Sequence, residues 1–179
     1  WSSDVCSSDL KELKPLTDAI DSADVIILTS PVYVYHCTGS MKAWLDHYGY
    51  RWMLHRPNPD MFSKQGVCIS TAAGAGTKWT NKDMADSMFF WGMGKIYRYG
   101  TAVHAINYKS ISPEKMAEIE KATDKLAEKI RKNYGHVKPG LKTKTYFEVM
   151  RKLVKSGWNE VDVAYWKEHG WTEKDRPWK

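Results

Sequence analysis

Residues 24–46 read DVIILTSPVYVYHCTGSMKAWLD, and this stretch decides the fold of the chain. It opens with the apolar run Val25–Leu28, which predicts a strand buried on both faces of a parallel sheet. Pro31 ends that strand because proline has no N–H to give to a sheet. A loop over 32–38 follows, and apolar residues at helical spacing predict a helix that begins at Gly39. Open α/β sheets hold their ligands at such a strand, loop and helix.

Residues 30–46 carry the motif S-P-V-Y-x(5)-G-x-x-K-A-x-x-D. The motif resembles the second flavin loop of the flavodoxin-like NAD(P)H-dependent FMN reductases. The resemblance is closest to the branch that includes the iron–sulfur flavoproteins, although the closely spaced cysteines of a cluster are absent from this sequence. It extends from about Leu10 to the C-terminus, where YWKEHGWTEKDRP (165–177) is similar to the tail of some flavodoxin-family oxidoreductases. The implied fold is α/β, a flavodoxin-like three-layer sandwich with a parallel sheet and a helical C-terminal extension.

The resemblance also implies a flavin mononucleotide (FMN) site between two loops. The implied cofactor-binding residues are Ser30, Pro31, Val32, Tyr33, Val34 and Gly39 from the first loop and Thr71, Ala72, Ala73 and Gly74 from the second. Tyr33 is expected to stack on or flank the flavin ring, and the second loop to meet the pyrimidine edge. Without a ligand, Tyr33 would be a half-buried loop aromatic, and Gly39 would simply allow the chain to enter a helix. We assign no catalytic residue and no metal ligand.

The second loop follows the predicted strand Gln65–Thr71, and its small residues let a planar ligand approach the backbone closely. A phosphate loop is the alternative. Gly74 and Gly76 give G-x-G, but Trp79 stands where the dinucleotide fingerprint needs glycine. The order Gly-Thr-Lys also differs from that of a nucleotide-triphosphate loop. Without the neighbouring flavin motif, a tight turn into a helix would be the favoured interpretation.

Further elements follow from periodicity and capping residues. We expect helices from about Pro15 to Ser22, over 81–91 and from Ser112-Pro113 to about Tyr134, and a last strand over 95–105 with an irregularity at Gly100. In the second of these helices, one face formed by Met84, Met88 and Trp91 is expected to pack into the hydrophobic core. The third should bury a stripe formed by Met116, Ile119, Thr123, Leu126 and Ile130.

The first ten residues, WSSDVCSSDL, have neither helical nor strand periodicity and resemble translated adapter sequence. We therefore divide the chain into a non-native segment 1–10, an incomplete flavodoxin-like domain 11–138 and a C-terminal extension 139–179. A flavodoxin-like domain should begin with a strand and a hydroxyl- and glycine-rich phosphate loop. Our hypothesis is that the source sequence lacks the first strands, this loop and the helix between them.

His36 and Cys37 resemble an acid/base or thiol pair, but the sequence shows no carboxylate to orient the imidazole. The favoured interpretation is that both are loop residues at the rim of the pocket without a catalytic role. His47 and His104 are expected to be structural, and His104 is expected in the last strand. Lys42 and Asp46 have the i, i+4 spacing of a helical ion pair. Cys68 lies in a predicted strand and is expected to be a buried, inert thiol.

Composition places the chain among soluble globular proteins, with 42% hydrophobic and 27% charged residues. No apolar run approaches the roughly 20 residues that a membrane span requires. The three cysteines have no metal-ligand spacing and are odd in number, which favours a reducing compartment over a disulfide framework. We therefore predict a cytoplasmic protein without a membrane partner.

Positive charge gathers in the C-terminal part of the chain. Residues 1–108 hold 10 basic and 10 acidic residues, and 109–179 hold 17 and 11, which accounts for the whole net charge of +6. Between Lys129 and Lys155, nine basic residues face only Glu148. A nucleic-acid patch is one interpretation, but no nucleic-acid motif accompanies the charge, so we do not expect that partner. A solvated helix face, or attraction of the phosphates of NADPH, is favoured.

Four of the nine tryptophans follow residue 157, in a tail that should pack against its own chain or a partner subunit. We favour a homodimer. The predicted function is an FMN-dependent NAD(P)H oxidoreductase that passes hydride and electrons through flavin to a small acceptor such as a quinone, a nitroaromatic or free flavin. The alternative is non-enzymatic, a flavodoxin-like electron carrier or a cofactor-free interaction domain.

Overall fold

A parallel three-stranded sheet in the order β1-β2-β3 forms the centre of the computed structural model, which describes residues 7–179. The strands are β1 (Val25–Pro31), β2 (Gln65–Ala72) and β3 (Lys95–Ala102). The helices are α1 (Ser7–Ser22), α2 (Gly39–His47), α3 (Thr77–Phe90), α4 (Pro113–Asn133), α5 (Leu141–Lys155) and α6 (Glu160–Glu168). Short 3-10 helices lie at Gly49–Arg51, Pro59–Ser63 and Tyr108–Ser110. The predicted strand, loop and helix at 24–46 are confirmed.

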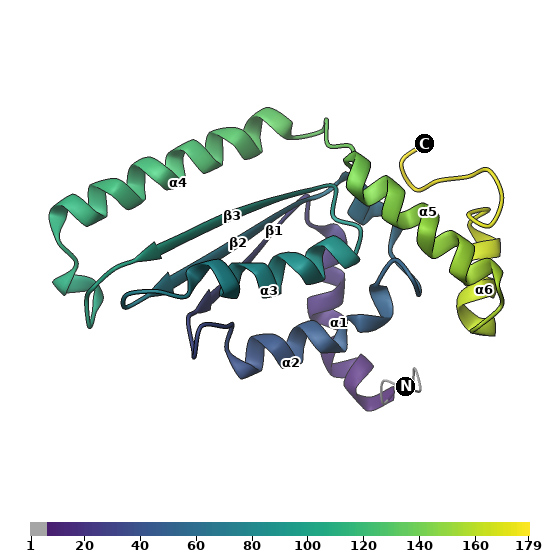
Figure 1. Cartoon of the computed structure of the whole chain (residues 1–179), viewed down its shortest axis with the longest axis horizontal. Coiled ribbons are helices and arrows are strands. Elements are labelled where there is room, and N and C mark those ends of the chain that lie inside the picture. The colour runs from purple at the N-terminus through teal and green to yellow at the C-terminus, as the bar shows by residue number, and fades with distance from the viewer. Residues whose placement is uncertain (1–6) are drawn as a thin grey trace.

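Helices cover both faces of the sheet, as a three-layer sandwich requires (Figure 1). The first three helices pack on one face, and their core contains Ile20 of α1, Leu45 of α2 and Met84 of α3 together with Leu28 and Cys68 of the sheet. The predicted core positions Met88 and Trp91 are buried there too. On the other face, α4 accepts hydrogen bonds from side chains of β2 and β3 through its backbone carbonyls.

The strand β1 is buried on only one face, which corrects the prediction of burial on both. Its residues alternate between buried and exposed along the strand, and Ile27 is 56% exposed. The reason is topological, because β1 is an edge strand of the described sheet and α4 lies over β2 and β3 instead. A continuous apolar run shows that a strand can be buried on both faces, and the neighbouring elements decide whether it is.

The helix α1 runs through Pro15 and begins at Ser7, so the prediction that this helix begins near the proline is wrong. A proline inside a helix removes one hydrogen bond and clashes with the carbonyl four residues earlier, and the helix nevertheless continues on both sides of Pro15. At its other end Lys64 donates from Nζ to the carbonyls of Ile20 and Ala23 at 3.2 and 2.8 Å. The buried ammonium group thereby satisfies the free carbonyls that every helix leaves at its C-terminus.

Three further expectations change in the structure. The helix α3 begins at Thr77 rather than residue 81, because Gly76 precedes it in the left-handed conformation. Gly100 causes no irregularity, since it pairs regularly with Ser70; instead a Cβ there would lie 2.5 Å from Thr77. The helix α4 is capped by Ser112 as predicted, but its apolar stripe is half-buried and none of its residues is fully buried.

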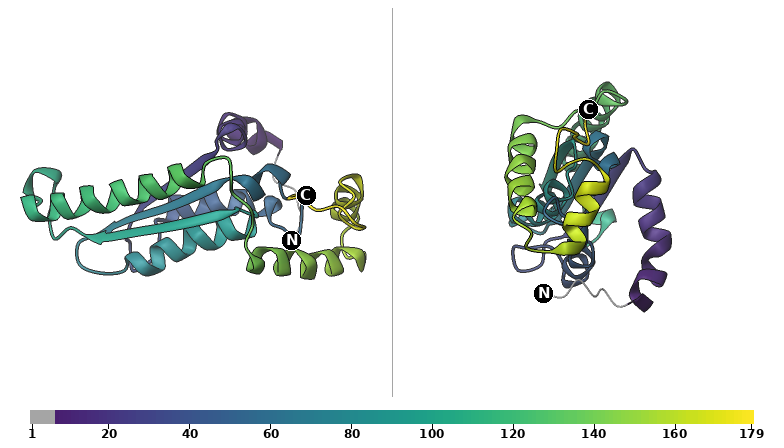
Figure 2. Two further views of the ribbon diagram at one scale, coloured as in Figure 1. Left: turned by 90° about the horizontal axis from the view of Figure 1, so that it is seen from above. Right: turned by 90° about the vertical axis from the view of Figure 1, so that its right-hand side faces the viewer.

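The C-terminal extension builds a second core beyond the amino ends of the strands (Figures 1 and 2). Its buried members are Met53, Phe62, Phe147, Met150, Val154, Trp166 and Trp171. The tail therefore packs on its own chain, and this packing needs no second copy. Within residues 7–179, no helix combines the length and the apolar character that a membrane crossing requires.

Candidate functional site

Three loops meet at the carboxyl ends of the strands. The first follows β1 over 32–38, the second follows β2 over 73–76, and the third follows β3. The backbone N–H of Val32 donates to the carbonyl of Thr71 at 2.9 Å, and the N–H of His104 donates to the carbonyl of Ala73 at 3.2 Å. The structure therefore brings together the two loops that the sequence assigned to the flavin.

In the first loop, Ser30 is buried and its hydroxyl ties the two ends of the loop together. It donates to the carbonyl of Pro31 at 2.9 Å and accepts from the N–H of Thr38 at 3.1 Å. Tyr33 and Val34 are exposed, with Val34 92% accessible to solvent. Side chains at the tip of this loop are thus free to contact a ligand, whereas Ser30 acts through the shape of the loop.

The second loop presents unoccupied backbone donors. Thr71, Ala73 and Gly74 are exposed and Ala72 is buried at the end of β2. Within residues 7–179, no hydrogen bond uses the backbone N–H of Gly74 or its two successors. A Cβ at Gly74, as at Gly39 in the first loop, would meet no atom within 4 Å, so the surface there is open.

These features fit the pyrimidine edge of a flavin. That edge carries carbonyl oxygens and a ring nitrogen that accept hydrogen bonds, and backbone N–H groups on small residues can approach a planar ring closely. The role of residues 30–34 and 71–74 in holding the ring stays a prediction from the resemblance.

His36 has a carboxylate partner, which corrects the sequence analysis. Asp83 of α3 lies 3.0 Å from Nδ1 of His36, and its Oδ2 also accepts from the backbone N–H of Cys37 at 3.1 Å. His36 and Asp83 are 47 residues apart in the sequence. No local pattern could have paired them, since Asp83 lies on the helix after the next strand.

The third loop was missed as part of the site. His104 lies beyond β3 rather than inside it, with a left-handed backbone (φ 48°), so its expected place in the last strand is wrong. Ile106 and Tyr108 follow, both strongly exposed. The sequence does show Ile106 and Tyr108 directly after a predicted strand. Without the strand order, however, their position beside the other two loops could not be known.

Neither described cysteine is set up as a nucleophile. Burial, followed by the nearby Asp83 carboxylate, raises the pKa of the Cys37 thiol above its usual value. Burial raises the pKa of Cys68 to about 12, and its thiol contacts the sulfur of Met88 at 3.7 Å in the core. A high pKa leaves little thiolate at neutral pH, so Cys68 is the inert core residue that was predicted.

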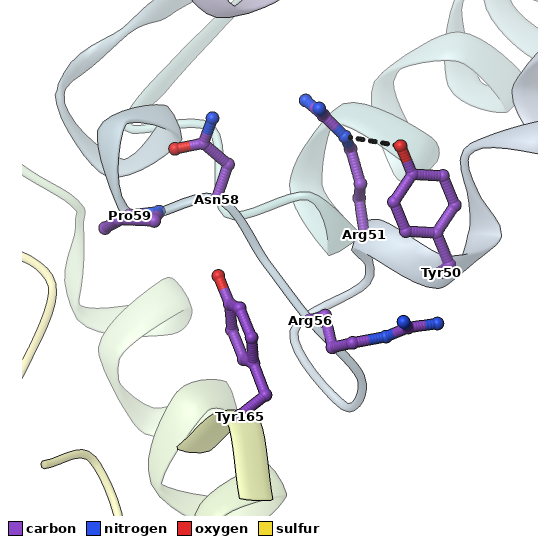
Figure 3. Close-up of a pocket in the computed structure, with 6 residues that line it drawn as sticks. All are labelled: Tyr50, Arg51, Arg56, Asn58, Pro59 and Tyr165. Atoms are coloured by element: carbon purple, nitrogen blue, oxygen red, sulfur yellow. Dashed lines mark hydrogen bonds between the residues drawn. The ribbon is translucent and has the colours of Figure 1, made fainter. Parts of the chain in front are cut away.

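A cavity of about 500 Å³ lies at the opposite end of the sheet, between the segment after α2 and α6. Its lining residues are Tyr50, Arg51, Arg56, Asn58, Pro59 and Tyr165 (Figure 3). Several of their polar groups are already engaged with protein. Tyr165 donates to the carbonyl of Pro57 at 2.8 Å, and Arg51 and Asn58 both donate to Asp21. This cavity therefore marks where the extension joins the domain, well away from the three loops.

The pair of Asp21 and Arg51 at this junction ties α1 to the segment after α2. Two guanidinium nitrogens donate to the carboxylate at 2.5 and 2.8 Å, and Arg51 is almost fully buried. Burial raises the pKa of Asp21, but hydrogen bonds and charge from Arg51, with contributions from Asn58 and Lys64, outweigh burial. The net pKa lies below the ordinary value of 3.8.

A carboxyl group with a lowered pKa in the folded state stabilises the fold at neutral pH, and this contribution is lost as the pH falls through its folded pKa. We expect Asp21→Asn to lower the urea midpoint of unfolding at pH 7, because it leaves Arg51 buried without its charge partner. The difference in urea midpoint between this variant and the unaltered protein should decrease as the pH falls below 3.8. Urea titrations between neutral and acidic pH measure it.

Asp18→Asn is the matched control, since Asp18 lies on the same helix in an exposed pair with Lys14. Its midpoint should follow that of the unaltered protein at each pH. A gap for Asp21→Asn that does not change with pH would contradict the assigned pKa.

Comparison with protein families adds an independent finding to this geometry. Residues 2–107 match the family described as NADPH-dependent FMN reductase, which is more than half of the chain and includes the three loops as far as residue 107. The chain belongs to the NADPH-dependent FMN reductase family. The family name states the cofactor, FMN, and the reductant, NADPH. No curated protein sequence matches the chain significantly.

Three solved structures are similar to the chain. A structure described as a flavone reductase is 18% identical, with a TM-score of 0.51 over 73% of this chain and 50% of that chain. The apo NADH:FMN oxidoreductase EMOB is 18% identical (TM-score 0.47, 66% of this chain and 59% of that one). An FMN-dependent NADH-azoreductase from Bacillus anthracis str. Ames Ancestor, in complex with FMN, is 12% identical (TM-score 0.48, 67% and 64%).

The chain thus spans about half to two thirds of the length of these structures. At this identity the likeness concerns the fold alone, and the match to the flavone reductase agrees with the predicted α/β class.

Proposed function

We propose that the chain binds FMN between the loops after β1 and β2 and acts as an NAD(P)H-dependent flavin oxidoreductase. The observation that carries the proposal is the meeting of these two loops at the carboxyl ends of the strands. The backbone N–H groups of Gly74 and its two successors make no hydrogen bond within the described part of the chain. Membership of the family supports it. The acceptor we propose is small, a quinone, a nitroaromatic or a second flavin.

The residues of the site would bind and orient rather than react. The backbone N–H groups of Gly74 and its neighbours would donate to the pyrimidine edge, and Tyr33 would cover or flank the ring. FMN, when bound, supplies the redox chemistry by taking hydride from a nicotinamide and passing electrons on. The protein's part is a slot of fixed shape with donors that favour negative charge on the ring.

We also propose that these loops hold the ring and not the phosphate of FMN. The two segments carry small, apolar and aromatic residues, and we propose that the ring edge lies at the backbone N–H groups of Gly74 and its two successors. No cationic side chain belongs to residues 71–74 or 30–34. Riboflavin, which has the same ring without the phosphate, separates the two contributions.

The test is titration of the purified chain with FMN and with riboflavin, followed by flavin fluorescence. We expect saturable quenching by the chain, with similar dissociation constants for the two flavins. Anaerobic addition of NADPH or NADH to the FMN complex should then bleach the visible flavin absorbance, and a quinone should restore it. Absence of quenching with both flavins would contradict the proposed function, and FMN binding much tighter than riboflavin would contradict the assignment of ring contacts only.

The acceptor, the homodimer and the cytoplasmic location remain predictions from the sequence. Exposed apolar side chains at the three loops, among them Val34 and Ile106, would give a second copy or an acceptor an apolar surface to contact.

A further inference from the structure

The loop after β1 contains a strained two-residue turn. Tyr33 and His36 exchange backbone hydrogen bonds of 2.9 and 3.0 Å, and the two residues between them, Val34 and Tyr35, have φ angles of 48° and 67°. A two-residue connection with both φ values positive is a type I′ turn, which asparagine and glycine favour. A β-branched valine in this conformation is a clear outlier. The turn does not follow from its own residues, so neighbouring groups must hold it.

Asp83 is the strongest of these neighbours. Its carboxylate bonds both the backbone N–H of Cys37 (3.1 Å) and Nδ1 of His36 (3.0 Å), and its side chain is only 26% exposed. A carboxylate that accepts from a backbone N–H is a strong hydrogen-bond partner. The Thr80 hydroxyl, one turn earlier on α3, shares its single proton between the carbonyls of Gly76 at 3.3 Å and Tyr35 at 3.5 Å, so its contact with the turn is the weaker one. Both contacts fasten the turn to α3.

The position of the turn sets the spacing of the two flavin loops. The Cα of Tyr35 lies close to Gly76, where a Cβ would come within 3.1 Å of it. Val32, directly before the turn, donates from its backbone N–H to the carbonyl of Thr71 near the end of β2. Any movement of the turn away from α3 would therefore change the slot between the loops and the place of Tyr33.

We propose that Asp83 is a positioning residue of the flavin site, whose carboxylate holds the strained Val34–Tyr35 turn against α3 and thereby fixes Tyr33 and the adjoining backbone toward the ring. The proposal rests on the proposed function as far as the flavin is concerned. An ordinary ion pair with His36 is a weaker explanation, because the His36 side chain is 62% exposed and exposed pairs contribute little. The bond to the Cys37 N–H is what an ion pair alone would not require.

The test compares Asp83→Ala in two backgrounds, the natural turn and a turn rebuilt as Asn-Gly by Val34→Asn and Tyr35→Gly. In the natural turn we expect Asp83→Ala to raise the dissociation constant of FMN about tenfold, which is close to the lower limit for loss of a hydrogen bond to a charged group. In the Asn-Gly background, which adopts a type I′ turn unaided, the same substitution should change it less than twofold. Asp83→Asn keeps an oxygen that can accept from Cys37 and should retain most of the affinity.

Asp86→Ala is the control, because Asp86 lies one turn further along α3 and pairs with Lys82 at the surface. It should leave the FMN dissociation constant unchanged. An equal loss for Asp83→Ala in both turn backgrounds would overturn the proposal, since Asp83 would then act other than through the turn.

Amide hydrogen exchange on the flavin-free chain tests the contact without any ligand. Asp83→Ala should accelerate exchange over 32–38 and leave β2 as protected as before. Unaltered exchange over 32–38 would overturn the proposal even if FMN affinity fell. If the unaltered protein did not bind FMN, the proposed function would fail, while accelerated exchange would still show that Asp83 holds the turn.

Discussion

Replacing Trp166 with alanine is expected to lower the free energy of unfolding by about 3–5 kcal/mol, the usual cost of removing a large buried aromatic side chain. Trp166 is fully buried, stacks on Phe147 with ring centroids 4.7 Å apart, and meets Trp171 edge-on. Its indole N–H also donates to the carbonyl of His55 at 2.7 Å. The substitution would open a cavity and leave that carbonyl without its partner, which adds to the cost.

The loss should reach the whole chain and not only the tail. The second core includes Phe62, which precedes β2, and Met53, whose N–H donates to the carbonyl of Phe90 at the end of α3. Urea unfolding followed by both far-ultraviolet circular dichroism and tryptophan fluorescence should therefore show one transition at a lower midpoint.

Trp158→Ala is the matched control, since this tryptophan belongs to the same extension but is 58% exposed. A surface substitution of this kind should change the free energy of unfolding by about 1 kcal/mol or less. Equal losses for the two variants, or separate transitions by the two probes, would contradict a second core that is continuous with the domain.

Replacing Gly76 with alanine is expected to weaken FMN binding more than tenfold. Gly76 has a φ of 103°, which alanine adopts only with strain. Its new Cβ would lie 2.5 Å from Cγ1 of Val32 and 3.1 Å from the Cα of Tyr35. The first loop would have to move away from the second, and the backbone donors after Gly74 would no longer face the same slot. Fluorescence titration with FMN measures the change.

Gly49→Ala controls for the general effect of a glycine substitution, because Gly49 has no atom within 4 Å of an added Cβ and no positive φ. It should retain the FMN dissociation constant of the unaltered protein. Urea unfolding of both variants shows whether each is folded under the assay conditions. If the Gly76→Ala protein were folded and bound FMN with unchanged affinity, the contact between the two loops would not matter for FMN binding, and the prediction would be wrong.

Local sequence predicted the elements that depend on local physics. The run from Val25 to Leu28 gave a strand that ends at proline, and Ser112 before Pro113 gave the start of α4, because strand period and helix capping involve residues only a few positions apart. The motif of residues 30–46 indicated the family that the comparison confirmed.

The predictions that failed depended on neighbours in space. Ile27 was expected to be buried and is exposed, because the strand order places β1 at an edge of the described sheet. The stripe on α4 is amphipathic as expected but only half-buried, although this helix lies over β2 and β3. In both cases the apolar pattern correctly predicted the type of element. How far neighbouring elements bury that pattern could not be predicted from the local sequence.

The sequence by itself determined the strand, loop and helix at 24–46, the small-residue loop after β2 and the family to which they belong. The tertiary structure decided which of these residues meet. It brought Asp83 to the turn from 47 residues away and folded the tryptophan-rich tail onto Phe62 and Met53. The physical reason is range, since helix and turn preferences act over a few residues, whereas contacts across a parallel sheet depend on the order in which the strands assemble.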